Sequence, residues 1–268
     1  ADIVSRAPKR ARVIGCPSCG GPLDKIVGDT CEHCGAPSAP GSRDWQVIEI
    51  QIQSRESRPP QLTGTTEEEG TDLPTLTAAD LKGEFGALAV RDPEFSWAKF
   101  QQRVEHVFHT FHEAWVAQEL APVRAYFSDQ LFEAQRYWVA AYQAQRLRNI
   151  TEDRQLVSIA LSRLLHDKYF DAITVRVFAQ CKDFTLDQNG NVVGGNRETP
   201  RRYSEYWTFI RSVDKRGAAK KDPVCPSCGA PIDKINMPGD CESCGVHVTT
   251  GEFDWVLSRI EQDEVYRL

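Results

Sequence analysis

The sequence predicts an α+β domain with a small cysteine-rich module on each side of it. Three observations lead to this fold class. Apolar residues recur at helical spacing over residues 96–148, and apolar and polar residues alternate at strand spacing between Ile150 and Arg211. A pattern of paired cysteines is present twice, once near each end of the chain. Helices that precede the strands, rather than alternate with them, are typical of α+β domains with an antiparallel sheet.

The cysteine pattern is an internal repeat. Residues 1–53 contain two Cys-x-x-Cys pairs that are eleven residues apart, and residues 223–268 contain two such pairs that are twelve residues apart. In both copies Asp-Lys-Ile follows the first pair and Asp-Trp follows the second pair. Because the match extends beyond the cysteines, we expect the two modules to fold alike.

Paired cysteines at this spacing predict zinc. Four thiolates from two Cys-x-x-Cys pairs form a closed tetrahedral site, so we predict a zinc ribbon with one structural Zn²⁺ in each module, two ions in all. Disulfides are disfavoured because a bridge within Cys-x-x-Cys is strained and the sequence shows no secretory signal. A redox-active pair would require a βαβ context, which we do not find. The predicted metal ligands are Cys16, Cys19, Cys31, Cys34, Cys225, Cys228, Cys241 and Cys244.

The segments around the central domain lack apolar periodicity. Residues 54–90 are rich in proline, glycine, threonine and glutamate, and we expect an acidic linker there, with room for one short helix in residues 76–91. Residues 215–222 are expected to form a flexible hinge into the second module. We assign the apolar segment from Trp255 to Ile260 to a strand of that module.

The central domain is predicted to cover residues 91–214. Ser96 and Ser128 are the expected N-caps of two long helices, and a short helical turn is expected between them. From Ile150 onward, long segments with period-two alternation are joined by a tight turn at residues 187–191. Tight connections of this kind join antiparallel strands, so we expect an antiparallel sheet.

No catalytic residue set is recognisable in the sequence. His106, His109 and His112 lie three residues apart on the first long helix, so neighbouring imidazoles could meet on its surface. They flank the apolar stripe, however, and no carboxylate lies at helical spacing on their own face. We therefore interpret His112 as a partly buried packing residue rather than a metal ligand.

The remaining reactive side chains also have ordinary interpretations. Cys181 is the one cysteine outside the pairs, and its place on the apolar phase of a strand predicts a small buried side chain rather than a nucleophile. Asp167, Asp171 and Asp183 are expected at strand ends, facing solvent. The sequence does not decide whether the protein is an enzyme, and the missing catalytic set favours a protein without activity.

Composition narrows the classes of partner. The 268 residues carry a net charge of −6, which argues against a dedicated nucleic-acid binder. Residues 91–222 hold 20 basic and 17 acidic residues, so an acidic surface or partner remains open for the middle of the chain. Eight of the nine cysteines lie in the pairs, which suits a reducing compartment. No apolar run approaches the ~18 residues of a membrane-spanning helix, so we expect no span within this sequence.

Several short segments of the middle of the chain occur together in one family. They are Asp-Pro-Glu-Phe-Ser at residues 92–96, Phe-His-Thr-Phe-His-Glu-Ala-Trp at 108–115, Arg-Ala-Tyr-Phe-Ser-Asp-Gln-Leu-Phe at 124–132, Arg-Asn at 148–149 and Tyr-Trp-Thr-Phe-Ile-Arg at 206–211. With them the chain resembles the Tim44-like family, named for a matrix-side subunit of the mitochondrial presequence translocase. Gly-Glu-Phe-Asp-Trp-Val at 251–256 is similar to the end of the zinc ribbon that follows this domain in bacterial members.

The resemblance implies a fold and a kind of function. The fold is a set of helices on a curved antiparallel sheet with a hydrophobic cavity between them, similar to the nuclear transport factor two-like cone. Family relatives are membrane-proximal scaffolds that bind protein partners, and bacterial relatives often carry membrane segments upstream. The resemblance brings no catalytic residues with it.

These observations lead to three hypotheses. The first is a non-catalytic, membrane-associated scaffold with two structural zinc sites, located on the cytoplasmic side, attached through segments outside this chain, and bound to protein partners that the sequence does not identify. The second is a cone-fold domain that binds a hydrophobic ligand or is an enzyme. For this hypothesis a buried acid facing a donor would favour catalysis, and a dry or collapsed pocket would oppose it. The third is a ribosome- or RNA-binding protein, which the net charge disfavours.

Overall fold

The computed structural model describes most of the chain from residue 59 onward and short stretches before it. The chain divides into two compact units, Ala1–Arg58 and Pro59–Leu268, and each is described by itself. The described residues are 2–4, 26–27, 30–32, 35, 46–49, 51, 53, 59–63, 70–219, 224–225, 227–231, 234–251 and 254–268.

The described part of the first unit consists of two small antiparallel strand pairs. β1 (Asp2–Val4) pairs with β4 (Gln46–Glu49), and β2 (Ile26–Val27) pairs with β3 (Thr30–Cys31). The β2–β3 hairpin follows the first cysteine pair of the sequence and includes the first cysteine of the second pair. It ends at Cys31, whose side chain is buried.

The second unit begins with helices. They are α1 (Leu81–Arg91), α2 (Trp97–Ala117), the 3-10 helix η2 (Ala121–Tyr126) and α3 (Asp129–Ala144). As predicted, Ser96 and Ser128 cap α2 and α3, because each hydroxyl accepts a hydrogen bond from the backbone three residues further on. α1 is the short helix expected near the end of the linker segment, and Asp80 caps it. None of the helices in the described part of the chain is long and apolar enough to cross a membrane.

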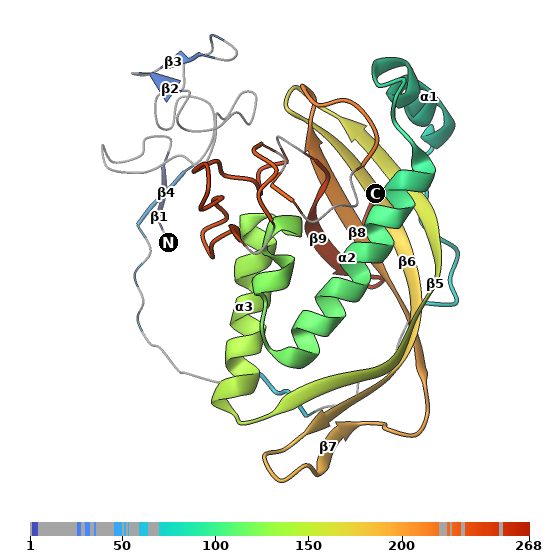
Figure 1. Cartoon of the computed structure of the whole chain (residues 1–268), viewed down its shortest axis with the longest axis vertical. Coiled ribbons are helices and arrows are strands. Elements are labelled where there is room, and N and C mark those ends of the chain that lie inside the picture. Colours follow the sequence, from blue (N-terminus) through green and yellow to red (C-terminus); the bar gives the residue numbers. More distant parts are fainter. Residues whose placement is uncertain are drawn as a thin grey trace. The chain divides into compact units, whose positions relative to one another are not determined.

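A five-stranded antiparallel sheet follows the helices (Figure 1). Its strands are β5 (Arg148–His166), β6 (Phe170–Leu186), β7 (Val192–Gly195), β8 (Arg201–Ser212) and β9 (Val256–Gln262). The strand order is β5-β6-β8-β9, and β7 pairs with β6. The β5–β6 ladder contains three register shifts, and Figure 1 shows both long strands bending around α2. Helices followed by this sheet confirm the predicted α+β class.

The last strand differs from our expectation. We assigned it to the second cysteine module, but β9 pairs with β8, with Trp207 opposite Ile260 and Phe209 opposite Leu257. The physical reason is burial, because Trp255 and Leu257 are both 0% exposed on the central core. A module of this size cannot cover that much apolar surface by itself. The end of the second module is therefore the edge strand of the central sheet.

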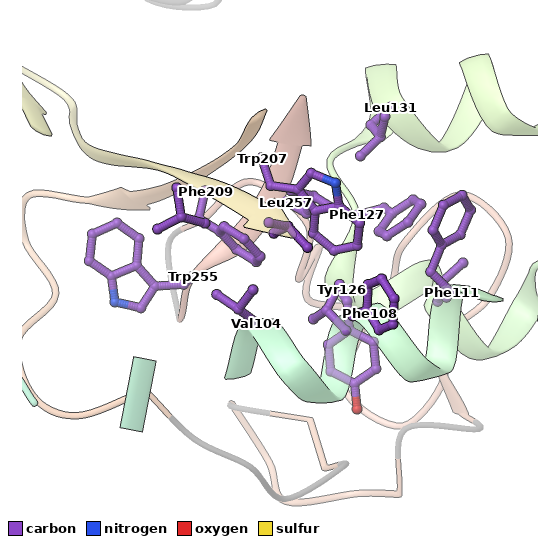
Figure 2. Close-up of a cluster of buried hydrophobic side chains, with 14 of the residues drawn as sticks. Val104, Phe108, Phe111, Tyr126, Phe127, Leu131, Trp207, Phe209, Trp255 and Leu257 are labelled. Carbon is purple, nitrogen blue, oxygen red and sulfur yellow. The ribbon is translucent and has the colours of Figure 1, made fainter. Parts of the chain in front are cut away.

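One core joins α2 to the sheet (Figure 2). Phe108 and Phe111 of α2 place their ring centroids 5.9 and 6.4 Å from that of Trp207 on β8. Trp207 is 0% exposed, which confirms the core-facing phase of its strand. Phe127, at the end of η2, lies 5.2 Å from Phe111 and extends the cluster toward α3. Aromatic pairs at these separations stabilise a core beyond the area that they bury.

The other face of the sheet is covered by the segment before α1 and by the C-terminal residues. Arg176 of β6 donates from Nη2 to the backbone oxygen of Gly70 at 2.7 Å and forms an ion pair with Asp263 at 3.0 Å. The rings of Tyr206 and Tyr266 stack with centroids 3.9 Å apart. The last part of the predicted linker is therefore packed on the central domain.

A buried ion pair connects the C-terminal end of α1 to β8. Arg211 donates from Nη2 to Asp92 Oδ2 at 2.8 Å, and neither side chain is more than 2% exposed. Gly217 closes the group, because its backbone N–H donates to Asp92 Oδ1 at 2.9 Å and its carbonyl accepts from Arg211 Nη1 at 2.8 Å. The first part of the predicted hinge is thus anchored to the domain.

Candidate functional site

The four cysteines of the second module converge on one point. The sulfur atoms of Cys225, Cys228, Cys241 and Cys244 all lie within 4.8 Å of one another. The Sγ atoms of Cys225 and Cys244 are 3.9 Å apart, and those of Cys228 and Cys241 are 3.7 Å apart. A tetrahedral zinc site with Zn–S bonds of about 2.3 Å requires sulfur–sulfur separations of about 3.8 Å. The donor set and its spacing therefore fit a tetrahedral Zn²⁺.

Backbone turns after the cysteine pairs hold the sulfurs in place. The N–H of Gly229 donates to the carbonyl of Cys225 at 2.8 Å, and the N–H of Gly245 donates to that of Cys241 at 2.7 Å. Both glycines have left-handed backbone angles, with φ values of +76° and +71°. The first unit contains the same turn, where Gly35 donates to the carbonyl of Cys31 at 2.8 Å with a φ of +68°. The repeat in sequence thus reappears as a repeated turn.

The short distances between the sulfur atoms shift the pKa values of the thiols in opposite directions. Burial raises the pKa of Cys241, but hydrogen bonds from the backbone amides of Ser243 and Cys244 outweigh burial. The net effect lowers the pKa to about 7. The amide of Ala230 lowers the pKa of Cys228, whereas hydrogen bonds with the neighbouring sulfurs raise it to about 12. Four thiolates at this distance repel one another unless a cation lies between them, which is the chemistry that a bound metal supplies.

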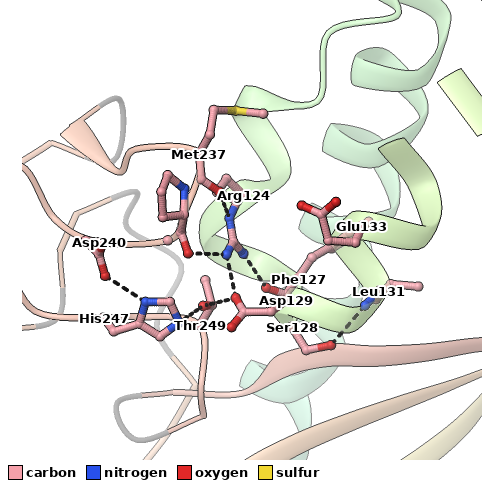
Figure 3. Close-up of polar contacts among 12 residues, drawn as sticks. Arg124, Phe127, Ser128, Asp129, Leu131, Glu133, Met237, Asp240, His247 and Thr249 are labelled. Carbon is pink, nitrogen blue, oxygen red and sulfur yellow. Dashed lines mark hydrogen bonds and ion pairs between the residues drawn. The ribbon is translucent and has the colours of Figure 1, made fainter. Parts of the chain in front are cut away.

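Arg124 of η2 fastens this module to the helices (Figure 3). Its guanidinium donates to the backbone oxygens of Met237 and Pro238, both at 2.6 Å, in the loop that precedes Cys241. The same group pairs with Asp129 at the start of α3 and lies 4.6 Å from the ring centroid of Phe132. The Arg124 side chain is only 3% exposed. These contacts dock the second module on the helices of the central domain.

His247 forms a second bridge at this interface (Figure 3). Its Nδ1 lies 2.7 Å from Asp240 Oδ1, and its Nε2 lies 3.1 Å from Asp129 Oδ2. Burial lowers the pKa of His247, but hydrogen bonds with the two aspartates outweigh it, so that the pKa is raised. Thr249 adds a hydrogen bond from its hydroxyl to Asp129 Oδ1 at 2.8 Å.

Of the eight predicted ligands, the structure brings together the four in the second module. Cys31 is placed on β3, whereas Cys16, Cys19 and Cys34 lie outside the described residues. The first metal site therefore stays a prediction, as does the identity of the metal in both modules.

A cavity of about 560 Å³ lies between the helices and the sheet. Helices α2 and α3 contribute four aromatic side chains to its wall, and strands β5, β6 and β8 contribute polar ones. Gln61 and Leu62, from the segment before α1, complete one side. The aromatic residues are Phe111, Trp115, Trp138 and Tyr142. The resemblance implied a hydrophobic cavity, but this one combines aromatic with ionisable groups.

An ion pair lies in the cavity wall. Asp183 accepts from Arg201 Nη1 at 2.8 Å and from Asn149 Nδ2 at 2.8 Å. Asn149 in turn accepts from Trp115 Nε1 at 2.9 Å, which links the sheet to α2. The expectation that Asp183 faces solvent was wrong, because the domain turns its strand end into the cavity.

The expectation that Asp171 faces solvent was also wrong. It is 2% exposed rather than solvent-facing. Its Oδ1 lies 2.8 Å from His166 Nδ1 and 3.2 Å from Arg91 Nη2. The two basic partners come from α1 and from β5, so only the folded chain shows why this acid is buried.

A further acid, Glu205 of β8, reaches the same cavity. Its Oε2 accepts from Trp207 Nε1 at 3.0 Å, and burial raises its pKa. By accessible surface Glu205 is half-buried, and it is one of the residues that line the cavity. Nearby, the Tyr203 hydroxyl lies 3.1 Å from His112 Nε2. Burial raises the pKa of Tyr203, and burial, aided by the charges of Arg154 and His109, lowers the pKa of His112 to about 3.

The expectations for two other residues are confirmed. His112 is 9% exposed and packs against Phe108 and Phe111 as a neutral ring. Cys181 is 2% exposed, and burial raises the pKa of its thiol to about 12, which makes it a poor nucleophile. Sequence reasoning missed Glu205, although an acid on the apolar phase of a strand was a visible signal. It also missed Arg124, for which no local signal exists.

Comparison with models of protein families identifies the family of the central domain. The family model of the Tim44-like domain matches residues 84–220, which is more than half of the chain. These residues contain α2, α3 and all strands of the central sheet except β9. No curated protein matches the chain.

Proposed function

The chain belongs to the Tim44-like domain family, and we propose that it is a membrane-associated scaffold whose central domain and second cysteine module act as one protein-binding body. The observation that carries the proposal is the match over residues 84–220. Family membership indicates a membrane-associated, protein-binding role. The partners, the cytoplasmic location and attachment through segments outside this chain are our proposals.

The metal modules have a structural role in this proposal. A site with four cysteine ligands leaves no open position for a substrate or for water. Zinc would instead stabilise the module, because the binding energy of a structural ion becomes folding energy. Arg124 and His247 tie that module to α3, so that metal binding stabilises a surface shared by both parts. We assign the same role to Cys16, Cys19, Cys31 and Cys34 in the first module.

The polar contacts that cross the domain support a scaffold. Asp92 with Arg211, and Arg124 with the loop before Cys241, hold elements together in buried geometry. Both groups make structural contacts between elements that are far apart in the sequence. We assign no catalytic role to these residues.

Crosslinked pull-down with the tagged full-length protein from native cells tests the proposal. We expect partner proteins to be enriched in the membrane fraction. Replacing Cys228 and Cys244 together with serine should weaken that enrichment, because it removes two metal ligands. Cys181→Ala is the matched control, since it removes a thiol outside the modules. A protein that stays free of partners and does not float with vesicles of native lipids would refute the scaffold.

A second candidate function is supported by the cavity. A cavity of about 560 Å³ is within the size range of small-molecule sites. The cavity is not collapsed, and its wall holds an acid, Glu205, that accepts from the donor Trp207 Nε1, so a domain that binds a ligand or is an enzyme stays the second candidate.

A further inference from the structure

The cavity has two chemically distinct kinds of wall. Trp115, Trp138 and Tyr142 present aromatic rings from α2 and α3, and the sheet presents the carboxyl groups of Asp183 and Glu205. Aromatic faces carry partial negative charge, so they attract cations in the same way as carboxylates do, though more weakly. Both kinds of wall therefore favour the same sign of charge in a ligand.

The charge balance of the wall points in the same direction. Among the described residues that line the cavity, Arg201 alone carries a permanent positive charge, and it is engaged by Asp183 at 2.8 Å. His112 is neutral because its pKa is lowered to about 3 by burial and by nearby positive charges. The cavity wall thus contains two carboxyl groups, of Asp183 and Glu205, and one guanidinium group, of Arg201. An anionic ligand would meet Glu205 without an available cation to compensate it.

Glu205 is the acid that remains for a ligand. Asp183 already accepts from Arg201 and Asn149, whereas Glu205 accepts a single hydrogen bond, from Trp207 Nε1 to its Oε2. Its side chain is a member of the cavity lining, together with the aromatic residues and the ion pair.

We propose that this cavity binds a small organic cation, a quaternary ammonium or protonated amine, with its charge against Glu205 and its alkyl groups against the aromatic rings of α2 and α3. This binding site does not rest on the scaffold function, and either could fail without the other. The same head group occurs in free solutes and on zwitterionic lipids, so the test includes both sources.

Binding of a cation is coupled to a proton. Burial raises the pKa of Glu205, which favours its protonated form before the ligand arrives. A cation stabilises the carboxylate and releases that proton. Affinity should therefore rise with pH until the pKa of the free protein is passed, and then level off. The titratable and charged groups that line the cavity or act on its residues are Arg201, Arg154, Tyr203, Cys181, Asp183, His112, His109 and Asp263.

Calorimetry on the full-length protein tests the site with matched probes. The probes are choline, its neutral carbon analogue 3,3-dimethylbutan-1-ol, and octanoate as an anion. We expect choline to bind at least about tenfold more tightly than the alcohol, and octanoate not to bind. Repeating the titration in buffers of different ionisation enthalpy should show proton release of up to one per choline. Dihexanoylphosphatidylcholine below its micelle concentration is the lipid arm, and tighter binding of this lipid than of choline would identify a lipid head group.

Two variants separate charge from shape. Glu205→Gln keeps the shape of the side chain and should weaken choline binding by about tenfold or more, while abolishing proton release. Glu113→Gln, an exposed acid on α2, is the matched control and should change neither. Trp138→Leu should weaken choline binding without affecting proton release. Equal binding of choline and the alcohol, or unchanged binding in folded Glu205→Gln, would overturn the proposal. Should that variant misfold, the comparison of choline with the neutral alcohol on the wild type decides by itself.

Discussion

Replacing Arg124 with methionine tests whether one guanidinium couples the second cysteine module to the helices. The side chain is 3% exposed and donates to two backbone oxygens of the module, at 2.6 Å each. Methionine retains most of the packing against Phe132 but loses every donor. The variant therefore isolates the polar contribution of the clamp.

The magnitude follows from the exposure of each partner. A buried hydrogen bond from a charged group contributes about 1.5–3 kcal/mol, and neighbouring bonds are not additive. Asp129 is 56% exposed, so its ion pair with Arg124 adds no more than about 1 kcal/mol. The freed carbonyls of Met237 and Pro238 can be partly hydrated. We expect Arg124→Met to lower the free energy of unfolding by about 2–4 kcal/mol.

Urea unfolding followed by tryptophan fluorescence measures the loss, and a chromogenic chelator measures metal release. Arg124→Met should lower the urea midpoint and release the metal of the second module faster. Arg136→Met is the control, because Arg136 forms an exposed pair with Glu133 on α3 and should change stability by less than about 0.5 kcal/mol. If the two variants have the same midpoint and the same release rate, Arg124 does not couple the module to the domain.

Three further predictions address the core, the metal and pH. Trp207→Ala should cost about 3–5 kcal/mol because the ring is fully buried, and a near-native melting temperature would contradict this packing. Elemental analysis should find two zinc ions per chain, and one after Cys16 and Cys19 are both replaced by serine. A single ion in the wild type would refute the double site. The raised pKa of His247 stabilises the folded protein below the unfolded value of about 6.5, and this contribution is lost as pH rises through the folded pKa. The melting temperature of the wild type should therefore exceed that of His247→Gln at pH 6 by more than at pH 8, and a constant difference would exclude this titration.

Local chemistry explains which parts of the fold the sequence could predict. Ser96 and Ser128 identify helix starts because an N-cap needs only its own hydroxyl and the next turn. Trp207 falls on the correct face of its strand because alternation is a property of consecutive residues. The assignment of the last strand failed because pairing of β9 with β8 depends on residues about fifty positions away.

The same distinction between local and distant residues explains which parts of the candidate sites could be predicted. The four cysteines of the second module could be grouped from spacing alone, because two short motifs in one small module must meet. The environment of Asp183 could not, since Asn149 and Arg201 come from two other strands. Glu205 carried a usable signal, an acid between Tyr203 and Trp207 on the apolar phase, but its hydrogen bond appears only in the fold.

Family membership and cavity chemistry are separate properties of this chain. Segments that carry the resemblance contain Asp92, Arg124 and Arg211, and these residues hold elements together in buried contacts. Glu205 and Asp183 lie outside those segments, although Asn149 within them orients Asp183. The shared segments therefore account for the framework, and the ionisable wall of the cavity does not follow from them. For this reason binding of an organic cation must be measured on this protein and cannot be inferred from its family.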